Sequence, residues 1–179
     1  MSEIQVASRY AKSIIDLAVE QNVLEEVKSD IELFIETCRA NPALQAILKN
    51  PIISLDKKAG ILEGLFADKL NKMILSFFKI VIRKGRSEIL YATGKEFINQ
   101  YNVLKNIVKA KVTSASSLSS ENIKEIEDVI KEATQGEVYL STEVDPDLIG
   151  GFILKVGDKQ FDASLSSKLN KLRKEFIQN

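Results

Sequence analysis

The chain has 179 residues, of which 45% are hydrophobic and 28% are charged, a composition typical of a globular protein with one ordinary domain or two small ones. Its 25 Lys and Arg residues balance 25 Asp and Glu residues, which disfavours nucleic acid as a partner because non-specific nucleic-acid binders carry a basic excess. It has no histidine and one cysteine, Cys38, which excludes an internal disulfide and every Ser-His or Cys-His nucleophilic pair.

The first hundred residues predict six consecutive amphipathic helices. Asn41-Pro42 and Asn50-Pro51 separate the second, third and fourth helices, and Gly85 follows the fifth, because proline interrupts helices and glycine commonly ends them. Ser54 and Ser87 are the predicted N-caps of the fourth and sixth helices. The expected helices span residues 4–21, 23–39, 43–49, 55–66, 69–84 and 88–102.

Near residue 106 the hydrophobic period changes from helical to alternating. Val108, Ala110 and Val112 predict a half-buried strand, and a serine-rich loop then leads into an amphipathic helix that ends near Gly136. Further strands are expected at 138–144, 152–156 and 159–162, followed by a terminal helix over 165–177. The sequence therefore predicts an α+β protein, with a six-helix bundle in residues 1–105 and a small α/β domain in residues 106–179.

Residues that could carry chemistry are sparse. Gly150-Gly151 lacks a phosphate-loop pattern around it and is better explained by a bulge or a close backbone approach. Asp158 and Asp162 flank a short strand and offer one acid/base hypothesis, a small hydrolase. We expect no cofactor and no metal. No apolar run approaches the roughly 20 residues that span a bilayer, and the first residues lack a signal pattern, so we expect no direct membrane insertion.

Two helices carry more apolar surface than one core requires. On a helical wheel, the apolar arc of the fifth helix covers roughly 220° and that of the first roughly 180°, whereas a helix on one core needs about 100° or somewhat more. A groove between them for a partner's amphipathic helix is one explanation, and central burial of the fifth helix is another. Its polar side carries Lys72, Lys79, Arg83 and Arg86, a pattern also typical of a solvated face.

Several motifs along the whole chain resemble those of the ATP synthase delta subunit family, which includes the mitochondrial oligomycin-sensitivity-conferring protein. The segment from Ala7 to Ser13 resembles the family's opening motif, and Lys84-Gly85-Arg86 follows the fifth helix as it does there. The most specific match runs from Glu143 to Ser164 and contains the family's glycine pair and aspartates at the same spacing. These signature residues are Asp145, Gly150, Gly151, Gly157, Asp158, Asp162 and Ser164.

The resemblance implies a non-catalytic stator subunit on the cytoplasmic face of a bacterial plasma membrane. It implies that the N-terminal bundle binds the N-terminal helix of an alpha subunit between the first and fifth helices, and that the C-terminal domain holds the C-terminus of the peripheral-stalk b subunits. A stand-alone peptide-binding scaffold is the alternative. The expected groove residues are Tyr10, Ala11, Ile14, Ile15, Phe77, Phe78, Ile80 and Val81.

Overall fold

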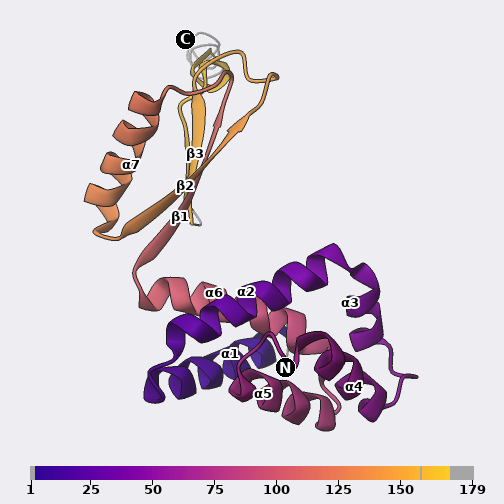
Figure 1. Cartoon of the computed structure of the whole chain (residues 1–179). Helices are drawn as coiled ribbons and strands as arrows, with labels where there is room; N and C mark the ends of the chain where they lie inside the picture. The colour runs from indigo at the N-terminus through magenta and orange to yellow at the C-terminus, as the bar shows by residue number, and fades with distance from the viewer. Residues whose placement is uncertain (1–2, 158, 170–179) are drawn as a thin grey trace. The chain divides into compact units, whose positions relative to one another are not determined.

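The protein has two compact units, Met1–Tyr101 and Asn102–Asn179. The structure, a computed structural model, describes residues 3–157 and 159–169. Helices make up the first unit and a four-stranded mixed sheet lies in the second (Figure 1), which confirms the α+β class. Tyr101, at the end of the first unit, is 5% exposed, and its hydroxyl donates a 2.6 Å hydrogen bond to Glu25, which ties this part of the sixth helix to the second helix.

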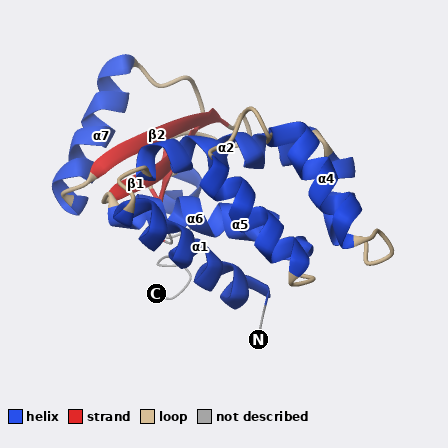
Figure 2. Ribbon diagram, turned by 60° about the horizontal axis from the view of Figure 1, so that its bottom comes forward, coloured by secondary structure: helices blue, strands red, loops and turns tan. Residues whose placement is uncertain are grey.

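The first unit is built from helices that loops connect (Figure 2). None of the described helices is long and apolar enough to cross a membrane. Their bounds are α1 (Glu3–Glu20), α2 (Leu24–Ala40), α3 (Pro42–Lys49), α4 (Leu55–Phe66), α5 (Lys72–Arg83), the 3-10 helix η1 (Ser87–Ile89) and α6 (Leu90–Leu104).

Aromatic side chains from three helices meet in the core of this unit. The ring of Phe34 on α2 lies 5.7 Å from that of Phe66 on α4 and 4.7 Å from that of Phe78 on α5. All three side chains are at most 2% exposed. Burying a side chain of this size stabilises the fold by about 1.5–3 kcal/mol, so this cluster fixes α5 against α2 and α4.

Two predicted helix starts are wrong, and in both cases a side chain explains the difference. Helix α5 begins at Lys72 rather than Lys69 because Asn71 is its N-cap and accepts a 3.0 Å hydrogen bond from the Met73 N–H. Ser87 does not cap α6. It lies inside η1, is 3% exposed, and donates instead to the Leu48 carbonyl at 2.6 Å.

The second unit contains a sheet with strand order β2-β1-β3-β4. Its first two strands are parallel and are therefore joined by a crossover helix, α7, whereas β3 is antiparallel to both β1 and β4. Helix α7 packs against the sheet (Figure 1), over the face that carries the buried side chains of Ala110 and Val112. The bounds are β1 (Ile107–Ser114), α7 (Ser120–Thr134), β2 (Glu137–Val144), β3 (Phe152–Val156) and β4 (Lys159–Asp162).

Helix α7 begins at Ser120, inside the serine-rich stretch, and the hydroxyl of Ser119 caps it by accepting a 3.2 Å hydrogen bond from the Asn122 N–H. The expected terminal helix begins at residue 165 and is helical through residue 169. Its remaining residues, 170–177, lie outside the described part of the chain.

Candidate functional site

Helices α1 and α5 meet through two half-buried aromatic rings. Tyr10 and Phe77 make an edge-to-face contact with ring centroids 5.9 Å apart. Ile80 follows Phe77 by three positions, which places both on one side of α5, and it is 53% exposed. Val6, one turn before Tyr10, is also half-buried. These four residues, Val6, Tyr10, Phe77 and Ile80, are called the α1–α5 face below.

The other five expected groove residues lie in the core of this chain, each at most 7% exposed. Because neighbouring helices of the same chain cover them, they offer almost no surface to a partner. Of the expected groove residues, only Tyr10, Phe77 and Ile80 are not buried. Central burial therefore explains part of the wide apolar arc of α5. These five residues are Ala11, Ile14, Ile15, Phe78 and Val81.

The turn after α5 places Arg86 beside this face. Gly85 has φ +70°, a conformation that favours glycine. It allows two hydrogen bonds that close the helix, from the Gly85 N–H to the Ile82 carbonyl at 2.7 Å and from the Arg86 N–H to the Val81 carbonyl at 3.1 Å. This pair of bonds is the Schellman motif. The chain therefore turns sharply after α5, and these hydrogen bonds hold the backbone of Arg86 in place.

A buried polar cluster holds the next residue. Lys58 on α4 is 4% exposed, and its Nζ donates to the Leu48 carbonyl at 2.9 Å and to the Ser87 hydroxyl at 2.8 Å. Ser87 donates in turn to the same carbonyl. The ammonium thus lies near the C-terminal end of α3, where carbonyl groups favour a positive charge. With the Schellman motif before it and this cluster after it, the backbone at Arg86 is restrained from both sides.

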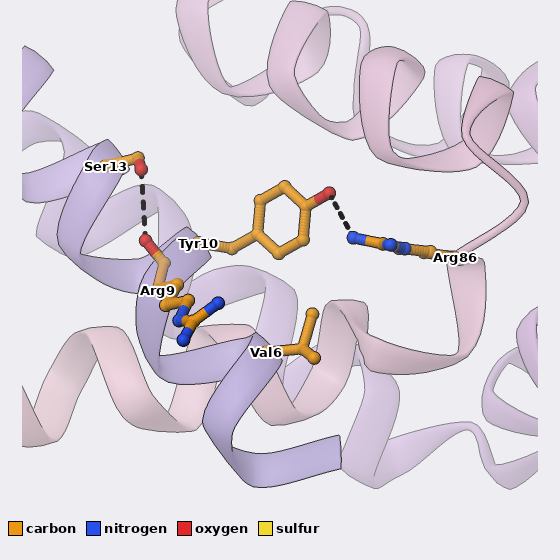
Figure 3. Close-up of a pocket in the computed structure, with 5 residues that line it drawn as sticks. All are labelled: Val6, Arg9, Tyr10, Ser13 and Arg86. Carbon is orange, nitrogen blue, oxygen red and sulfur yellow. Dashed lines mark hydrogen bonds between the residues drawn. The ribbon is translucent and has the colours of Figure 1, made fainter. Parts of the chain in front are cut away.

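The side chain of Arg86 returns to α1. Its Nη1 donates a 3.1 Å hydrogen bond to the hydroxyl of Tyr10, and its guanidinium carbon lies 6.0 Å from the centre of that ring. Both residues line a pocket of about 170 Å³ (Figure 3). Its lining consists of Val6, Arg9, Tyr10, Ser13 and Arg86. The sequence pattern placed Arg86 in a basic stripe and did not connect it with Tyr10. The signal in the sequence was Gly85, which directly precedes Arg86, because glycine commonly ends a helix.

The glycine pair of the second unit lets two segments of the chain approach each other closely. Gly151 has φ +82°, and a Cβ there would lie 2.4 Å from the Ala163 carbonyl oxygen. A Cβ on Gly150 would lie 2.6 Å from a methyl carbon of Leu165, whose N–H donates to the Gly150 carbonyl at 2.9 Å. These glycines therefore shape the start of β3 against the start of the terminal helix. A close approach to backbone at Gly151 and to the Leu165 side chain at Gly150 explains them without a ligand.

The other signature residues make local turns and caps. Asp162 accepts hydrogen bonds from the Ser164 N–H at 2.9 Å and from the Ser167 hydroxyl, and the Ser164 hydroxyl accepts from the Ser167 N–H at 3.3 Å. Asp145 accepts from the Asp147 N–H at 3.0 Å. Gly157 ends β3 with φ +55°. Asp158 lies outside the described residues.

A second apolar hollow, which the sequence pattern did not predict, lies between α7 and β3. It has a volume of about 320 Å³. Val129, on its rim, is 64% exposed, although its neighbour Ile130 is 4% exposed. The signal in the sequence was an apolar stripe on α7 that includes both residues. The hollow is lined by Leu118, Asn122, Glu125, Ile126, Val129, Phe152 and Leu154.

The structure gives little support to chemistry at these places. Among the described residues, no three His, Cys, Asp or Glu side chains are grouped to hold a metal ion. Burial raises the pKa of the Cys38 thiol to about 11, so this cysteine is protonated at neutral pH and is a poor nucleophile. Asp162, one half of the hydrolase hypothesis, is engaged in the cap described above.

Comparisons with known proteins agree with the motifs. The family described as "ATP synthase delta (OSCP) subunit" matches residues 6–176. "ATP synthase subunit delta" of Cytophaga hutchinsonii is 35% identical over 99% of this chain and 97% of its own length, and that of Christiangramia forsetii is 36% identical over 100% and 97%.

A solved structure shares the fold. A chain in the Toxoplasma gondii mitochondrial ATP synthase hexamer superposes with a TM-score of 0.73, at 18% identity, over 96% of this chain and 97% of that chain. The family match spans nearly the whole sequence, and its members are structural subunits, so the hydrolase hypothesis and the stand-alone scaffold are both set aside. The chain belongs to the ATP synthase delta (OSCP) subunit family and is a non-catalytic stator subunit of an F-type ATP synthase.

Proposed function

We propose that the helices of the first unit form a docking bundle for the N-terminal helix of an alpha subunit, and that the second unit holds the C-terminal end of the peripheral-stalk b subunits. The protein then links the catalytic head to the stalk on the cytoplasmic face of a bacterial plasma membrane. Its task is mechanical, because the head must not turn with the central shaft during ATP synthesis.

The contact between Tyr10 and Phe77, with Ile80 exposed beside it, is the observation that carries the first half of this proposal. An amphipathic helix needs an apolar strip that it can cover, and the α1–α5 face offers one from two helices at once. Aromatic side chains commonly supply most of the binding energy at such interfaces. Because both helices are fixed in the core by buried residues, the face is preformed and loses little entropy on binding.

Titration of the full chain with a synthetic peptide of the same organism's alpha-subunit N-terminus tests this half. Ile80→Asp should weaken binding at least about tenfold, because it places a charge in an apolar contact. Ile52→Asp is the matched control, since Ile52 is 90% exposed and lies outside the α1–α5 face. No binding at high micromolar peptide, or equal losses from both variants, would contradict the docking proposal.

The hollow between α7 and β3 supports the second half. An exposed Val129 above Phe152 and Leu154 gives an apolar recess on the second unit that a helix of the stalk could cover. Val129→Asp should therefore weaken binding of a peptide from the C-terminal end of the b protein, measured by calorimetry on the full chain. Ile149→Asp, at a residue 73% exposed and outside the hollow, is the control. An unchanged affinity for the Val129 variant would remove this hollow from the stalk contact.

A further inference from the structure

The pocket beside Tyr10 is a distinct feature at the edge of the α1–α5 face. Its volume of about 170 Å³ exceeds the roughly 30 Å³ that one water molecule occupies. Two arginines, Arg9 and Arg86, contribute to its lining, whereas no acidic side chain does. Val6 and the ring of Tyr10 supply an apolar wall (Figure 3). The pocket can therefore accept a group that is negatively charged at one end and carried on an apolar stem.

The charge of Arg86 is not neutralised within the described part of the chain. Its hydrogen-bond partner is the neutral hydroxyl of Tyr10, and no described carboxylate forms an ion pair with it. Lys79, on the polar side of α5, differs in this respect because Glu63 pairs with it at 2.8 Å. A guanidinium has five N–H donors, and the bond to Tyr10 engages one nitrogen only. The remaining donors can serve an incoming anion.

Arg86 is also held in place before any anion arrives. The Schellman motif at Gly85, the buried hydroxyl of Ser87 and the hydrogen bond to Tyr10 fix its backbone and the end of its side chain. A free surface arginine would lose rotamer entropy on pairing, and much of that loss is already incurred here. A guanidinium fixed in this way matches the planar, two-oxygen geometry of a carboxylate.

We infer that Arg86 and Tyr10, in the pocket that Arg9 also lines, form a subsite for one carboxylate, an Asp or Glu side chain of the helix that docks on the α1–α5 face. The inference rests on the proposed docking of that helix and adds the chemistry that fixes its register and direction. The apolar strip alone would let a helix slide or reverse, whereas a charged pocket at one end of the strip accepts only one placement.

The experiment uses the full chain and the alpha-subunit N-terminal peptide, with each acidic residue of the peptide replaced in turn by its amide. One replacement should weaken binding about tenfold or more, the loss expected for a charge-assisted hydrogen-bonded pair. Arg86→Gln should weaken binding of the unmodified peptide by a similar factor. It should change the affinity of the peptide with the sensitive amide replacement by less than about twofold. Arg83→Gln, an exposed arginine at the end of α5, is the matched control and should leave every affinity unchanged.

The outcomes separate the inference from the docking proposal. If the peptide binds and Ile80→Asp weakens it, but no amide replacement has an effect, docking stands and the carboxylate subsite is wrong. If no peptide binds, both are wrong. Inorganic phosphate is the last probe. If phosphate competes with the peptide at micromolar concentration, and Arg86→Gln abolishes this competition, the pocket is a site for a free anion and the inference is wrong. Circular dichroism of the Arg86 variant should show unchanged helicity.

Discussion

The guanidinium of Arg86 and the phenol of Tyr10, 76 positions apart in the sequence, form a 3.1 Å hydrogen bond that joins the turn after α5 to the middle of α1. The same tyrosine makes the edge-to-face contact with Phe77. One ring thus connects an apolar strip with a charged pocket. Under the docking proposal, this one small cluster sets both the strength and the register of docking, and each of its residues can be tested separately.

Gly85→Ala should weaken both folding and docking. A Cβ meets no atom within 4 Å at this position, so the cost arises from the backbone at φ +70°, about 1–2 kcal/mol for a residue other than glycine. Relaxation of the turn would also move Arg86 away from Tyr10. We expect a lower urea midpoint and a several-fold weaker affinity for the alpha-subunit peptide.

Gly64→Ala is the control for that substitution. Gly64 lies inside α4, has no positive φ, and also has open space around its missing Cβ. Alanine is the better helix former by about 0.5–1 kcal/mol, so this variant should raise the urea midpoint and leave peptide affinity unchanged. Destabilisation by both variants would show that the Gly85 effect does not come from its left-handed backbone.

The sequence was sufficient to predict most of the elements, because local signals agree with the packing. The Asn-Pro breaks and Gly85 mark helix ends that the structure retains within a few residues. The N-cap expected at Ser87 failed since a buried carbonyl and Lys58 compete for its hydroxyl. That contact joins residues 29 and 39 positions apart, which no local pattern reveals.

The exposed part of the α1–α5 face was harder to predict for the same reason. A helical wheel shows how wide an apolar face is, but it cannot show which part of that face the chain itself covers. Phe78 and Val81 are buried in the core of the first unit, whereas Ile80 is exposed. The sequence also did not reveal the hydrogen bond between Arg86 and Tyr10, because a basic residue after a helix is usually solvated. Only the tertiary fold brings Arg86 to α1.

Asp30 gives a pH-dependent prediction. Burial raises the pKa of its carboxyl above the ordinary 3.8, Glu26 adds to this effect, and a 2.7 Å hydrogen bond from the Asn71 N–H opposes it. The folded protein therefore binds this proton more tightly than the unfolded chain does. Its contribution to stability is complete at pH below 3.8 and is lost as the pH rises through the raised value.

Asp30→Asn should remove that loss, because an amide oxygen can still accept from the Asn71 N–H without carrying a charge. Urea unfolding across roughly pH 3 to 7 measures the difference between variant and parent. We expect the free energy of unfolding of the variant, relative to that of the parent, to increase as the pH rises. A difference that moves the other way would mean that the hydrogen bond outweighs burial.

Gly151→Ala should destabilise the second unit. A Cβ would lie 2.4 Å from a backbone oxygen of Ala163, and the φ of +82° adds strain, which together cost about 1–3 kcal/mol or more. Gly150→Ala is the comparison, because its Cβ would meet the side chain of Leu165, nearest at a methyl carbon, and no backbone atom among its three nearest contacts. Thermal unfolding should show a larger shift for Gly151→Ala. Equal shifts would argue against the close backbone approach as the reason for this glycine.

The short segment between α6 and β1 should be the first site of cleavage by trypsin. Lys105 is exposed and lies between the end of α6 at Leu104 and the start of β1 at Ile107. Val103, just before it, is 81% exposed. On the other side, Asn106 is tied to the second unit by a 2.9 Å hydrogen bond to the Gln135 carbonyl. Cleavage there breaks few contacts of either unit, so mass spectrometry should identify a fragment of residues 1–105.

That fragment should keep its helical circular dichroism and bind the alpha-subunit peptide with nearly the affinity of the full chain, because Tyr10, Phe77, Ile80 and Arg86 all lie within it. It should not bind the peptide from the b protein, since the hollow beside α7 is gone. Both results follow from a protein with two separate docking sites on two units that fold independently. First cleavage inside residues 1–101, or a fragment that loses its helicity, would show that the first unit depends on the second for its stability.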